Sequence, residues 1–454
     1  MTSTVYYMNA RSASLETGLV PKLLAVFDAA GFDKLIKPKD VVAIKTHCGE
    51  WNNTGYLRPV YARALVDRIK SLGGRPFVCD TTTLPYSPYA SRVTELDFLA
   101  TAERNGYSPA VLGCPFICAD GFMGTDDYRV DLPEGYILKE AFIATAIAAA
   151  DVLITLTHFK GHAMGVIGGA IKNLGIGAQS KRGKFNVHMG GHPRYGFSGS
   201  ATLHPEKLAG RNGGDGGKWL EDLCPYGLVH VMDESIEWDQ EHCPACRACM
   251  GPMTSSGVLE VHNANQEAAN AAIADACLGV IKAVGKGKVA FINLALDLTP
   301  GCDCQGFSDM PIVPNLGVFA SYDPVAIDKA CIDKATGAIG ISGSTAAEKG
   351  VLAAGERKFE MCSSRAPGVS EEIQLVTGEI IGLGSRQYDL VEVAQGNPED
   401  FAFSPDSRPV GLRFRDKFAK FSPFPYDRYD GKGFLREDEV DLDRVNPGRR
   451  APTR

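Results

Sequence analysis

Apolar residues recur along the chain at two spacings, and the two spacings alternate. Positions three or four apart, typical of a helix with one buried face, cover residues 17–32 and 58–72. Short apolar runs of strand type cover residues 40–46 and 75–79. A repeated strand–helix–strand order with short connections predicts a parallel sheet covered by helices.

The same alternation continues to about residue 336. The further predicted strands are 151–156, 288–296 and 313–320. The further predicted helices are 95–105, 141–150, 266–284 and 323–336. The last of these helices has Asp323 at its N-cap and Pro324 at its first position, and both residue types favour a helix start.

Two regions depart from this pattern and divide the chain. Glycine-rich runs replace the pattern between residues 190 and 264, and the chain becomes charged and proline-rich after residue 396. We expect an N-terminal α/β part (1–189), a Gly-rich insertion with a Cys cluster (190–264), a C-terminal α/β part (265–396) and a C-terminal arm (397–454). The predicted fold class is α/β, with mostly parallel sheets and covering helices plus a small inserted Cys-rich segment.

Charge and composition narrow the classes of partner. The formal net charge is −7, which argues against a general nucleic-acid-binding protein. No stretch approaches the ~20 apolar residues that a membrane span needs, and the first residues do not have the pattern of a signal peptide. We therefore expect a cytoplasmic protein without membrane or nucleic-acid partners. In that compartment its 13 cysteines are expected to remain thiols.

Three of these cysteines have the spacing of an iron–sulfur site. Cys243, Cys246 and Cys249 are each separated by two residues, as in ferredoxin-like segments that hold a [4Fe–4S] cluster. The residues that follow, 250–253, supply no fourth cysteine. The fourth ligand could come from Cys302 or Cys304, the best candidates, or from Cys224, or one iron could be open to substrate.

Two other interpretations of the Cys cluster remain open. A zinc site could use two or three of the same thiols together with His242 or His262. The segment could also hold no metal. Cys302 and Cys304 are only two residues apart, so both would bind one metal only if their loop curls; the alternative for this pair is two partly buried free thiols.

Polar residues follow three of the predicted strands, where active groups of α/β folds are found. The candidates for catalysis are His47, Glu50, His158, Lys160 and His162. The candidates for substrate binding beside them are Lys45, Asn53, Asp80 and Thr81. A two-histidine, one-carboxylate iron site made of His158, His162 and Asp80 is a weaker alternative, because the lysines nearby would repel a metal ion.

A glycine-rich stretch follows the third of these strands, and its lysines suit an anionic ligand. Exposed backbone N–H groups and helix N-termini attract anions, and nearby lysines add positive charge. We expect this stretch to bind a small anion while His158 or His162 transfers protons. The binding candidates in the stretch are Gly168, Gly169, Lys172, Asn173, Lys181 and Lys184.

Five separated segments together resemble one known family. They are residues 46–59, 157–177, 243–249, 297–304 and 308–328, and they follow the order of the DUF362 family of bacteria and archaea. The resemblance extends over roughly residues 40–395. Members often carry an inserted ferredoxin-like iron–sulfur segment, so the resemblance implies such a segment at 190–264 and a role in the site for Cys302 and Cys304. It does not imply a particular reaction.

The expected function is that of a [4Fe–4S] oxidoreductase acting on a small anionic metabolite in anaerobic-type metabolism. A ferredoxin-type protein would supply the electrons, because no G-x-G-x-x-G segment or P-loop occurs in its proper context. One alternative is a non-redox lyase, hydratase or isomerase that uses an open cluster iron or Lys/His acid–base chemistry. Another is an electron-transfer or cluster-carrying partner protein. The sequence leaves the substrate and the oligomeric state open.

Overall fold

The computed structural model describes most of the chain up to residue 394. The described residues are 2–14, 16–84, 90–188, 201–210, 217–232, 235–239, 241–243, 248–394, 420, 435 and 437–445. Residues 1–397 form one compact unit and residues 398–454 a second. In the second unit, a turn of 3-10 helix spans Glu437–Glu439 and α17 spans Leu442–Val445.

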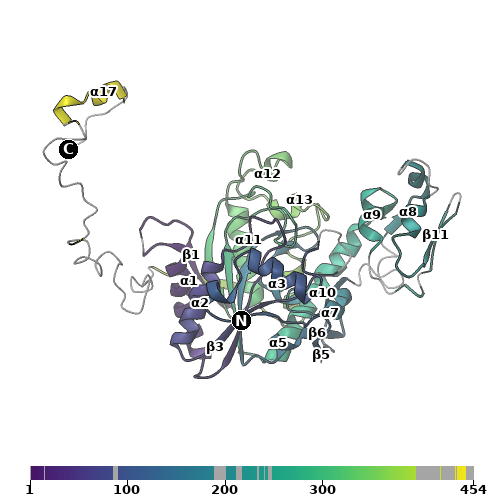
Figure 1. Ribbon diagram of the computed structural model, residues 1–454, viewed down its shortest axis with the longest axis horizontal. Helices are drawn as coiled ribbons and strands as arrows, with labels where there is room; N and C mark the ends of the chain where they lie inside the picture. Colours follow the sequence, from purple (N-terminus) through teal and green to yellow (C-terminus); the bar gives the residue numbers. More distant parts are fainter. Residues whose placement is uncertain are drawn as a thin grey trace. The chain divides into compact units, whose positions relative to one another are not determined.

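An eight-stranded sheet is the centre of the larger unit (Figure 1). Its strands are β1 (Ser3–Asn9), β2 (Val41–Lys45), β3 (Arg75–Asp80), β4 (Phe116–Cys118), β7 (Val152–His158), β14 (Val289–Ala295), β15 (Gly317–Ser321) and β16 (Tyr388–Glu392). They lie in the order β16–β1–β15–β14–β7–β2–β3–β4. The pairs from β14 to β4 and the β1–β16 pair are parallel, and only β15 runs antiparallel to its neighbours. The predicted fold class, α/β with a mostly parallel sheet, is confirmed.

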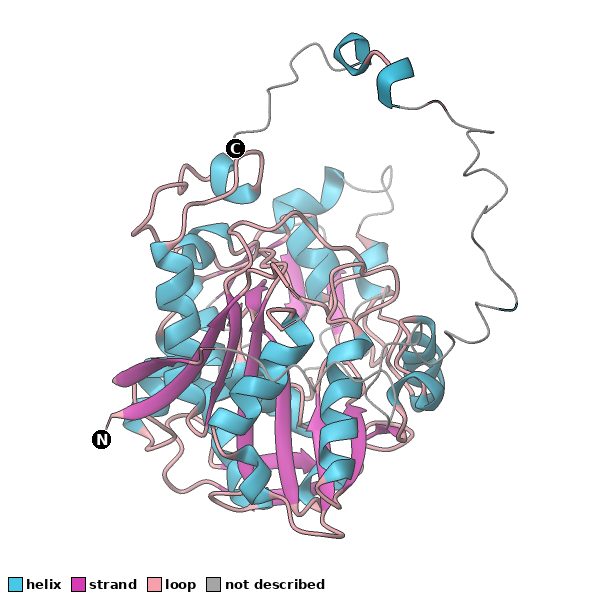
Figure 2. Cartoon of the chain, turned by 90° about the vertical axis from the view of Figure 1, so that its left-hand side faces the viewer, coloured by secondary structure: helices cyan, strands magenta, loops and turns pink. Residues whose placement is uncertain are grey.

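Both faces of this sheet are buried. Successive side chains of a strand point to opposite faces, and here each face packs into its own hydrophobic cluster. In β7, Ile154 and Leu156 belong to one hydrophobic cluster and Leu153 belongs to the other. One face packs on α1 (Leu19–Ala29), α2 (Pro59–Ser71) and α3 (Glu95–Arg104). The other packs on α6 (Ala170–Gly175), α10 (Asn263–Val284), α11 (Pro324–Gly337) and α14 (Ile373–Ile380). Figure 2 shows strands of the sheet together with helices that pack on it.

Short elements complete the larger unit. They are a 3-10 turn at Phe32–Leu35, α4 (Pro109–Leu112), α5 (Thr145–Ala148), α7 (Lys181–Val187), α12 (Thr345–Glu348), α13 (Lys358–Cys362) and the hairpins β5–β6 (Asp127–Asp131, Glu140–Ala144) and β8–β9 (Lys160–His162, Val166–Gly168). The predicted cap of α11 is present, since the Asp323 carboxylate accepts the N–H groups of Val325 and Ala326 at 2.8 and 3.0 Å.

The helix predicted over residues 141–150 is wrong. Residues up to Ala144 belong to β6, which pairs antiparallel with β5, and only α5 is helical. Phe142 and Ile143 in β6 are buried. Aromatic and β-branched side chains fit a paired strand, and this pairing outweighs the helix preference of the alanines.

The described part of the insertion has a small core of its own. Its elements are β10 (Ala201–Leu203), a 3-10 turn at Pro205–Gly210, α8 (Lys218–Glu221), β11 (Val229–Met232), β12 (Ser235–Trp238), α9 (Met250–Ser255) and β13 (Leu259–Val261). β10 pairs with β13 and β11 with β12, both antiparallel. Leu220, Val229, Met253 and Val258 form the centre of a separate hydrophobic cluster. The insertion therefore packs largely on itself.

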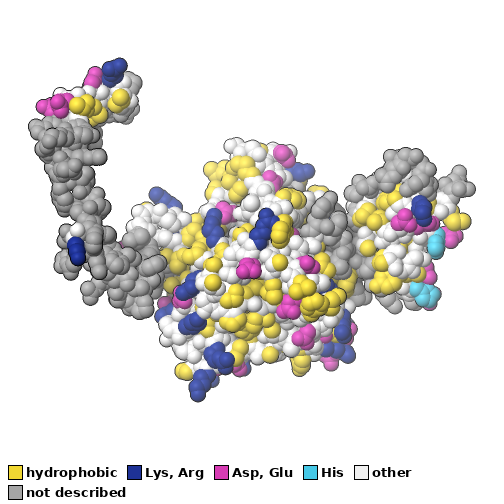
Figure 3. Space-filling view, viewed as in Figure 1, with side chains coloured by type: hydrophobic (Ala, Val, Ile, Leu, Met, Phe, Trp, Pro, Cys, Tyr) yellow, Lys and Arg dark blue, Asp and Glu magenta, His cyan; other side chains and the backbone are white. Residues whose placement is uncertain are grey.

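The visible surface of the larger unit carries both signs of charge. Figure 3 shows basic and acidic side chains interspersed with hydrophobic ones on this face. Within the described residues, no helix is both long enough and apolar enough to cross a membrane.

Candidate functional site

The carboxyl ends of neighbouring parallel strands meet at one edge of the sheet. β2 ends at Lys45, β3 at Asp80 and β7 at His158. Residues 297–304, which follow β14, cross the same edge: the Gly161 N–H donates to the carbonyl oxygen of Thr299 at 2.9 Å. The structure thus brings together the polar segments that the sequence placed after separate strands.

A small pocket opens at this edge. The space available to the centres of water-sized molecules is about 30 Å³, enough for two or three waters or a small molecule. Eight of its ten lining residues were predicted as site residues and two, Thr157 and Asp303, were not. The lining residues are His47, Thr157, His158, Lys160, Gly168, Gly169, Lys172, Asn173, Cys302 and Asp303.

Asp303 is the centre of a buried charged cluster on one wall. Its Oδ2 lies 2.5 Å from the Lys160 Nζ and 3.0 Å from the His158 Nδ1. Burial opposes ionisation of this carboxyl, but Lys160 and His158 outweigh it and lower its pKa to about 2. Burial also lowers the pKa of Lys160, and Asp303 opposes that fall. The positive charge of Lys160 is therefore neutralised within the protein by the Asp303 carboxylate.

His158 is held by hydrogen bonds at both ring nitrogens. Its Nε2 lies 2.6 Å from the carbonyl oxygen of Leu296, which can only accept, so Nε2 carries a proton. Its Nδ1 lies 2.8 Å from the Lys160 Nζ and 3.0 Å from the Asp303 Oδ2. In the neutral ring Nδ1 accepts from Lys160, and in the protonated ring it donates to Asp303.

A second buried network joins Lys45, Asp80 and Arg92. The Lys45 Nζ lies 2.9 Å from the Asp80 Oδ1, and the Arg92 Nη1 lies 3.3 Å from the Asp80 Oδ2. Although burial opposes ionisation, Lys45 and Arg92 keep the pKa of Asp80 below its usual value. Arg92 also pairs with Glu50 at 3.3 Å. Lys45 is therefore neutralised inside the protein, like Lys160.

Lys172 differs from both of these lysines. Among the described residues, its ammonium has no carboxylate within ion-pair distance and no hydrogen-bond acceptor, although the side chain is only 9% exposed. Burial, followed by the charges of Lys160 and Lys45, lowers the pKa of Lys172 to about 7. The site thus contains a buried amine that lines the pocket and can exchange a proton near neutral pH.

His47 lines the same pocket as a neutral ring. Its Nδ1 accepts the Gly49 N–H at 2.9 Å, and its Nε2 lies 3.3 Å from the Arg92 Nη2. Burial and the positive charges of Arg92 and Lys172 lower the pKa of His47 well below its usual value. Glu50, expected to orient this histidine, instead accepts from the backbone N–H and hydroxyl of Ser91 and pairs with Arg92.

Other predicted binding residues have structural partners outside the pocket wall. The Lys181 Nζ donates to the Thr82 hydroxyl and to the carbonyl oxygens of Val93 and Met123 at 2.6–2.7 Å. The Lys184 Nζ donates to the hydroxyl of Thr81 at 2.8 Å. The Asn53 amide donates to the carbonyl oxygens of Gln305 and Phe307, each at 3.0 Å. These side chains tie loops together, and sequence alone does not distinguish such contacts from ligand binding.

The N-terminus of α6 is capped from within the protein. Asp328 of α11 accepts the N–H groups of Ala170 and Ile171 at 2.7 and 3.0 Å. A Cβ at Gly169 would lie 2.3 Å from the same carboxylate, so glycine is required there. Burial raises the pKa of Asp328 to about 6. These two N–H groups, expected to contact an anion, are thus bound to Asp328, while Gly168 and Gly169 still line the pocket.

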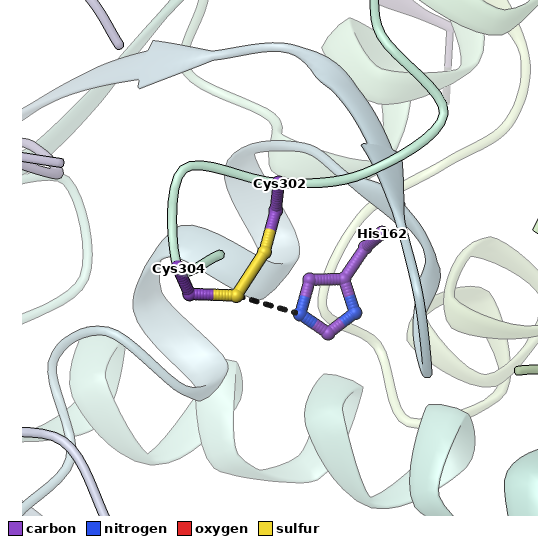
Figure 4. Close-up of side chains that lie close together, drawn as sticks. All are labelled: His162, Cys302 and Cys304. Carbon is purple, nitrogen blue, oxygen red and sulfur yellow. Dashed lines mark hydrogen bonds between the residues drawn. A yellow bond between two sulfur atoms is a disulfide. The ribbon is translucent and has the colours of Figure 1, made fainter. Parts of the chain in front are cut away.

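His162, Cys302 and Cys304 form a third cluster beside the pocket (Figure 4). One ligand atom of each lies within 4.8 Å of the others, and within the described residues this is the group with the spacing of a metal site. Asp80 is not part of it. The two sulfurs are joined in a disulfide, with the Cα atoms 5.3 Å apart. The expectation that all cysteines remain thiols is wrong for this pair, because the loop curls enough for the sulfurs to meet.

The cysteines of the insertion are only partly described. Cys246 lies outside the described residues, whereas Cys249 is the N-cap of α9 and belongs to the small core of the insertion. Cys224 packs against the same core, and its Sγ accepts the N–H of Leu228 at 3.3 Å. A sulfur that accepts a backbone N–H and borders the hydrophobic cluster that contains Cys249 is compatible with a fourth cluster ligand. Bonded to each other, Cys302 and Cys304 fit that role less well.

Comparison with known proteins assigns the chain to a family. A model described as "Domain of unknown function (DUF362)" matches residues 42–333. The chain belongs to the DUF362 family. The matched part of this DUF362 protein includes the whole pocket wall and the insertion. Search of the curated proteins found no match to it.

One solved structure that matches is the lactate racemase apoprotein from Thermoanaerobacterium thermosaccharolyticum. It is 12% identical, with a TM-score of 0.28, over 65% of the DUF362 chain and 51% of the other chain. The DUF362 chain thus spans about half the length of that protein. The fold class rests on the sheet itself and not on this likeness.

Proposed function

We propose that this protein is an enzyme that binds a small monoanionic metabolite, such as a short carboxylate, and transfers a proton to or from it. The observation that supports this most directly is the ammonium of Lys172 in the pocket wall, which has no carboxylate or acceptor partner among the described residues. Leaving the histidines aside, the described residues of the site contain four cationic groups and three carboxylates, so one positive charge is not balanced. These groups are Lys45, Arg92, Lys160 and Lys172 against Glu50, Asp80 and Asp303.

Each wall of the pocket has a role in this reaction. Lys172 binds the anion when protonated and accepts a proton when neutral, which a pKa of about 7 permits at physiological pH. His158 lines the same pocket, held by Leu296 and Asp303, and is the second candidate for proton transfer. The Thr157 hydroxyl accepts from the Asn173 amide at 2.9 Å, so its own proton can be donated to a ligand. This arrangement favours a lyase, hydratase or isomerase.

Anion binding is the first test of this proposal. In calorimetric titrations with acetate, lactate, malonate and phosphate, we expect a monocarboxylate to bind wild-type protein, with affinity falling as pH rises through 7 because Lys172 loses its proton. Lys172→Met should weaken binding at least roughly tenfold, the cost of one lost charged contact. Lys181→Met, which removes a lysine with internal partners, should not.

Proton transfer is tested with the carboxylates that bind. In D₂O, the carbon next to the carboxylate should incorporate deuterium in the presence of wild-type protein and not of Lys172→Met, as measured by NMR. If none of the anions bound, or if Lys172→Met bound them as well as wild type, the proposal would be wrong.

A [4Fe–4S] oxidoreductase with a ferredoxin-type partner is the second candidate function. It is favoured by the shared core of Cys224 and Cys249 in a segment with the Cys243, Cys246, Cys249 spacing. These four residues would hold the cluster, which would supply single electrons; zinc is the alternative metal.

Metal analysis decides between these cofactors. After anaerobic purification, we expect about four irons and four sulfides per chain, as one [4Fe–4S] cluster requires, and an EPR signal after dithionite reduction. Cys249→Ser and Cys224→Ser should lose the iron, and Cys304→Ser should keep it. Zinc in place of iron, or iron lost only from Cys304→Ser, would contradict this assignment.

A further inference from the structure

The disulfide between Cys302 and Cys304 is held at the pocket by its loop. A Cβ at Gly161 would lie 2.4 Å from the carbonyl oxygen of Pro300, so the loop lies directly on β8. Asp303, between the two cysteines, is fixed by its ion pairs on the pocket wall. Backbone and side-chain contacts thus fix both cysteines at a site where ligand can approach.

The two sulfurs have different surroundings. Cys302 is 4% exposed and lines the pocket that Lys172 also lines. Cys304 is the more exposed of the two, and its Sγ lies 3.9 Å from the Nε2 of His162 (Figure 4). A reagent from solution therefore meets Cys304 first. A negative charge that develops on the Cys302 sulfur would lie in the pocket wall that also contains Lys172.

The protonation of His162 is set by its other nitrogen. Its Nδ1 accepts the N–H groups of Gly165 at 2.7 Å and Met164 at 3.2 Å, so the proton of the neutral ring is on Nε2, facing Cys304. Burial and the charge of Lys172 keep the pKa of His162 well below its usual value. A metal on Nε2 would force a proton onto Nδ1, against two N–H donors. His162 is therefore better placed to donate its Nε2–H to a sulfur than to bind a metal ion.

We propose that Cys302 and Cys304 form a thiol–disulfide exchange centre that accepts two electrons from a dithiol reductant. A thiolate of the reductant attacks the Cys304 Sγ, the bond between the two cysteines breaks, and Cys302 leaves as a thiolate. The second thiolate of the reductant then attacks its own mixed-disulfide sulfur and releases Cys304, whose thiolate accepts a hydrogen bond from His162. Two protons complete the two thiols, and the dithiol becomes a disulfide.

This centre is distinct from the anion chemistry proposed for Lys172. It needs no substrate in the pocket and no metal. Its redox state is measured directly, by whether Cys302 and Cys304 can be alkylated. Failure of the anion-binding experiment would leave it standing, and its own failure would leave the anion site standing.

A single peptide reports the state of this pair. Trypsin cuts after Lys288 and Lys329 and at no lysine or arginine between them, and peptide 289–329 contains no cysteines except Cys302 and Cys304. Full-length protein is equilibrated in buffers with varied ratios of reduced to oxidised dithiothreitol, quenched with acid and alkylated. We expect the peptide to change reversibly from unlabelled to doubly labelled in one two-electron step.

Variants of His162 test its role as a positioning residue. His162→Ala should move the exchange equilibrium several-fold toward the disulfide, because the N–H of His162 no longer stabilises the reduced sulfur of Cys304. His162→Gln, which keeps an N–H donor, should recover part of the shift. His204→Ala, in the insertion, should leave the equilibrium unchanged.

Three outcomes would overturn the proposal. One is a peptide that is doubly labelled in every buffer, which means that no disulfide forms. Another is a reduced pair that alkylates only after a chelator is added, which means that the sulfurs bind a metal. The third is an equal shift in His162→Ala and His204→Ala, which means that His162 has no specific effect on the sulfurs.

Discussion

Lys172→Met is expected to stabilise the folded protein while weakening anion binding. In the wild type, burial lowers the pKa of Lys172 from 10.5 to about 7. At neutral pH, folding therefore destabilises the charged ammonium, which is the stable form in the unfolded chain. At about 1.4 kcal/mol for each pKa unit, the penalty is on the order of 4 kcal/mol. Methionine has similar length and no charge, so we expect a gain of about 2–4 kcal/mol in the free energy of unfolding, measured by urea denaturation at pH 7.

The pH dependence of this gain follows from the direction of the shift. Between pH 7 and 10.5 the unfolded chain binds more protons at Lys172 than the folded chain does, so wild-type stability rises with pH through this window. The difference between wild type and Lys172→Met should therefore be largest below pH 7 and vanish near pH 10.5. Lys181→Met is the matched control: it removes a buried lysine with three acceptors and should destabilise the protein by about 1–3 kcal/mol. Equal stability of Lys172→Met and wild type at pH 6 would show that the amine is not buried without a partner.

Asp303→Asn is expected to destabilise the folded protein strongly, in contrast to Lys172→Met. The substitution leaves the Lys160 ammonium, only 4% exposed, without its carboxylate. Removing one partner of a buried ion pair costs about 3–5 kcal/mol, because the other charge stays buried. We expect thermal and urea denaturation to show a loss of this size at pH 7. Lys160→Met in the same chain should recover part of it.

The acid side of the stability curve gives a second measurement on Asp303. Its pKa falls from 3.8 to about 2 on folding, so its contribution is present above pH 4 and is lost as the pH falls toward 2. Asp303→Asn should remove that part of the acid dependence. Asp297→Asn breaks an ion pair with the exposed Arg58 and should change stability by less than about 1 kcal/mol. A loss in Asp297→Asn equal to that in Asp303→Asn would mean that burial does not set the effect.

Local pattern was sufficient to predict much of the sheet and its helices. β2, α2, β3 and β7 follow from runs of apolar residues with clear helical or strand spacing, and Asp323 starts α11 as its residue type predicts. β15 was predicted as a strand, but nothing in its residues indicates that it runs antiparallel between β1 and β14. Its direction is set by pairing with two other segments, the nearby β14 and the distant β1, as in Tyr7 opposite Phe319.

The site was predictable where chemistry and strand ends coincide. His158 and Lys160 were identified because polar groups after buried strands meet at one edge. Asp303, which neutralises Lys160, was missed although it lies between two cysteines of a recognised segment. The sequence also could not predict that Lys181 has hydrogen-bond acceptors within the protein whereas Lys172 has none among the described residues. This difference depends on which carbonyl oxygens the folded loops bring near each amine.

The pairing of β10 with β13 joins the first and last strands of the described part of the insertion. Ala201 lies opposite Val261 and Leu203 opposite Leu259, so the first and last strands of the described part of the insertion lie one strand spacing apart. Between these points the segment has its own small core. A segment that has its own core and whose outer strands pair with each other can be lost, enlarged or exchanged during evolution with little change in the path of the rest of the chain. Family members with different insertions can therefore keep the same pocket, and the pocket and the cysteine segment can diverge separately.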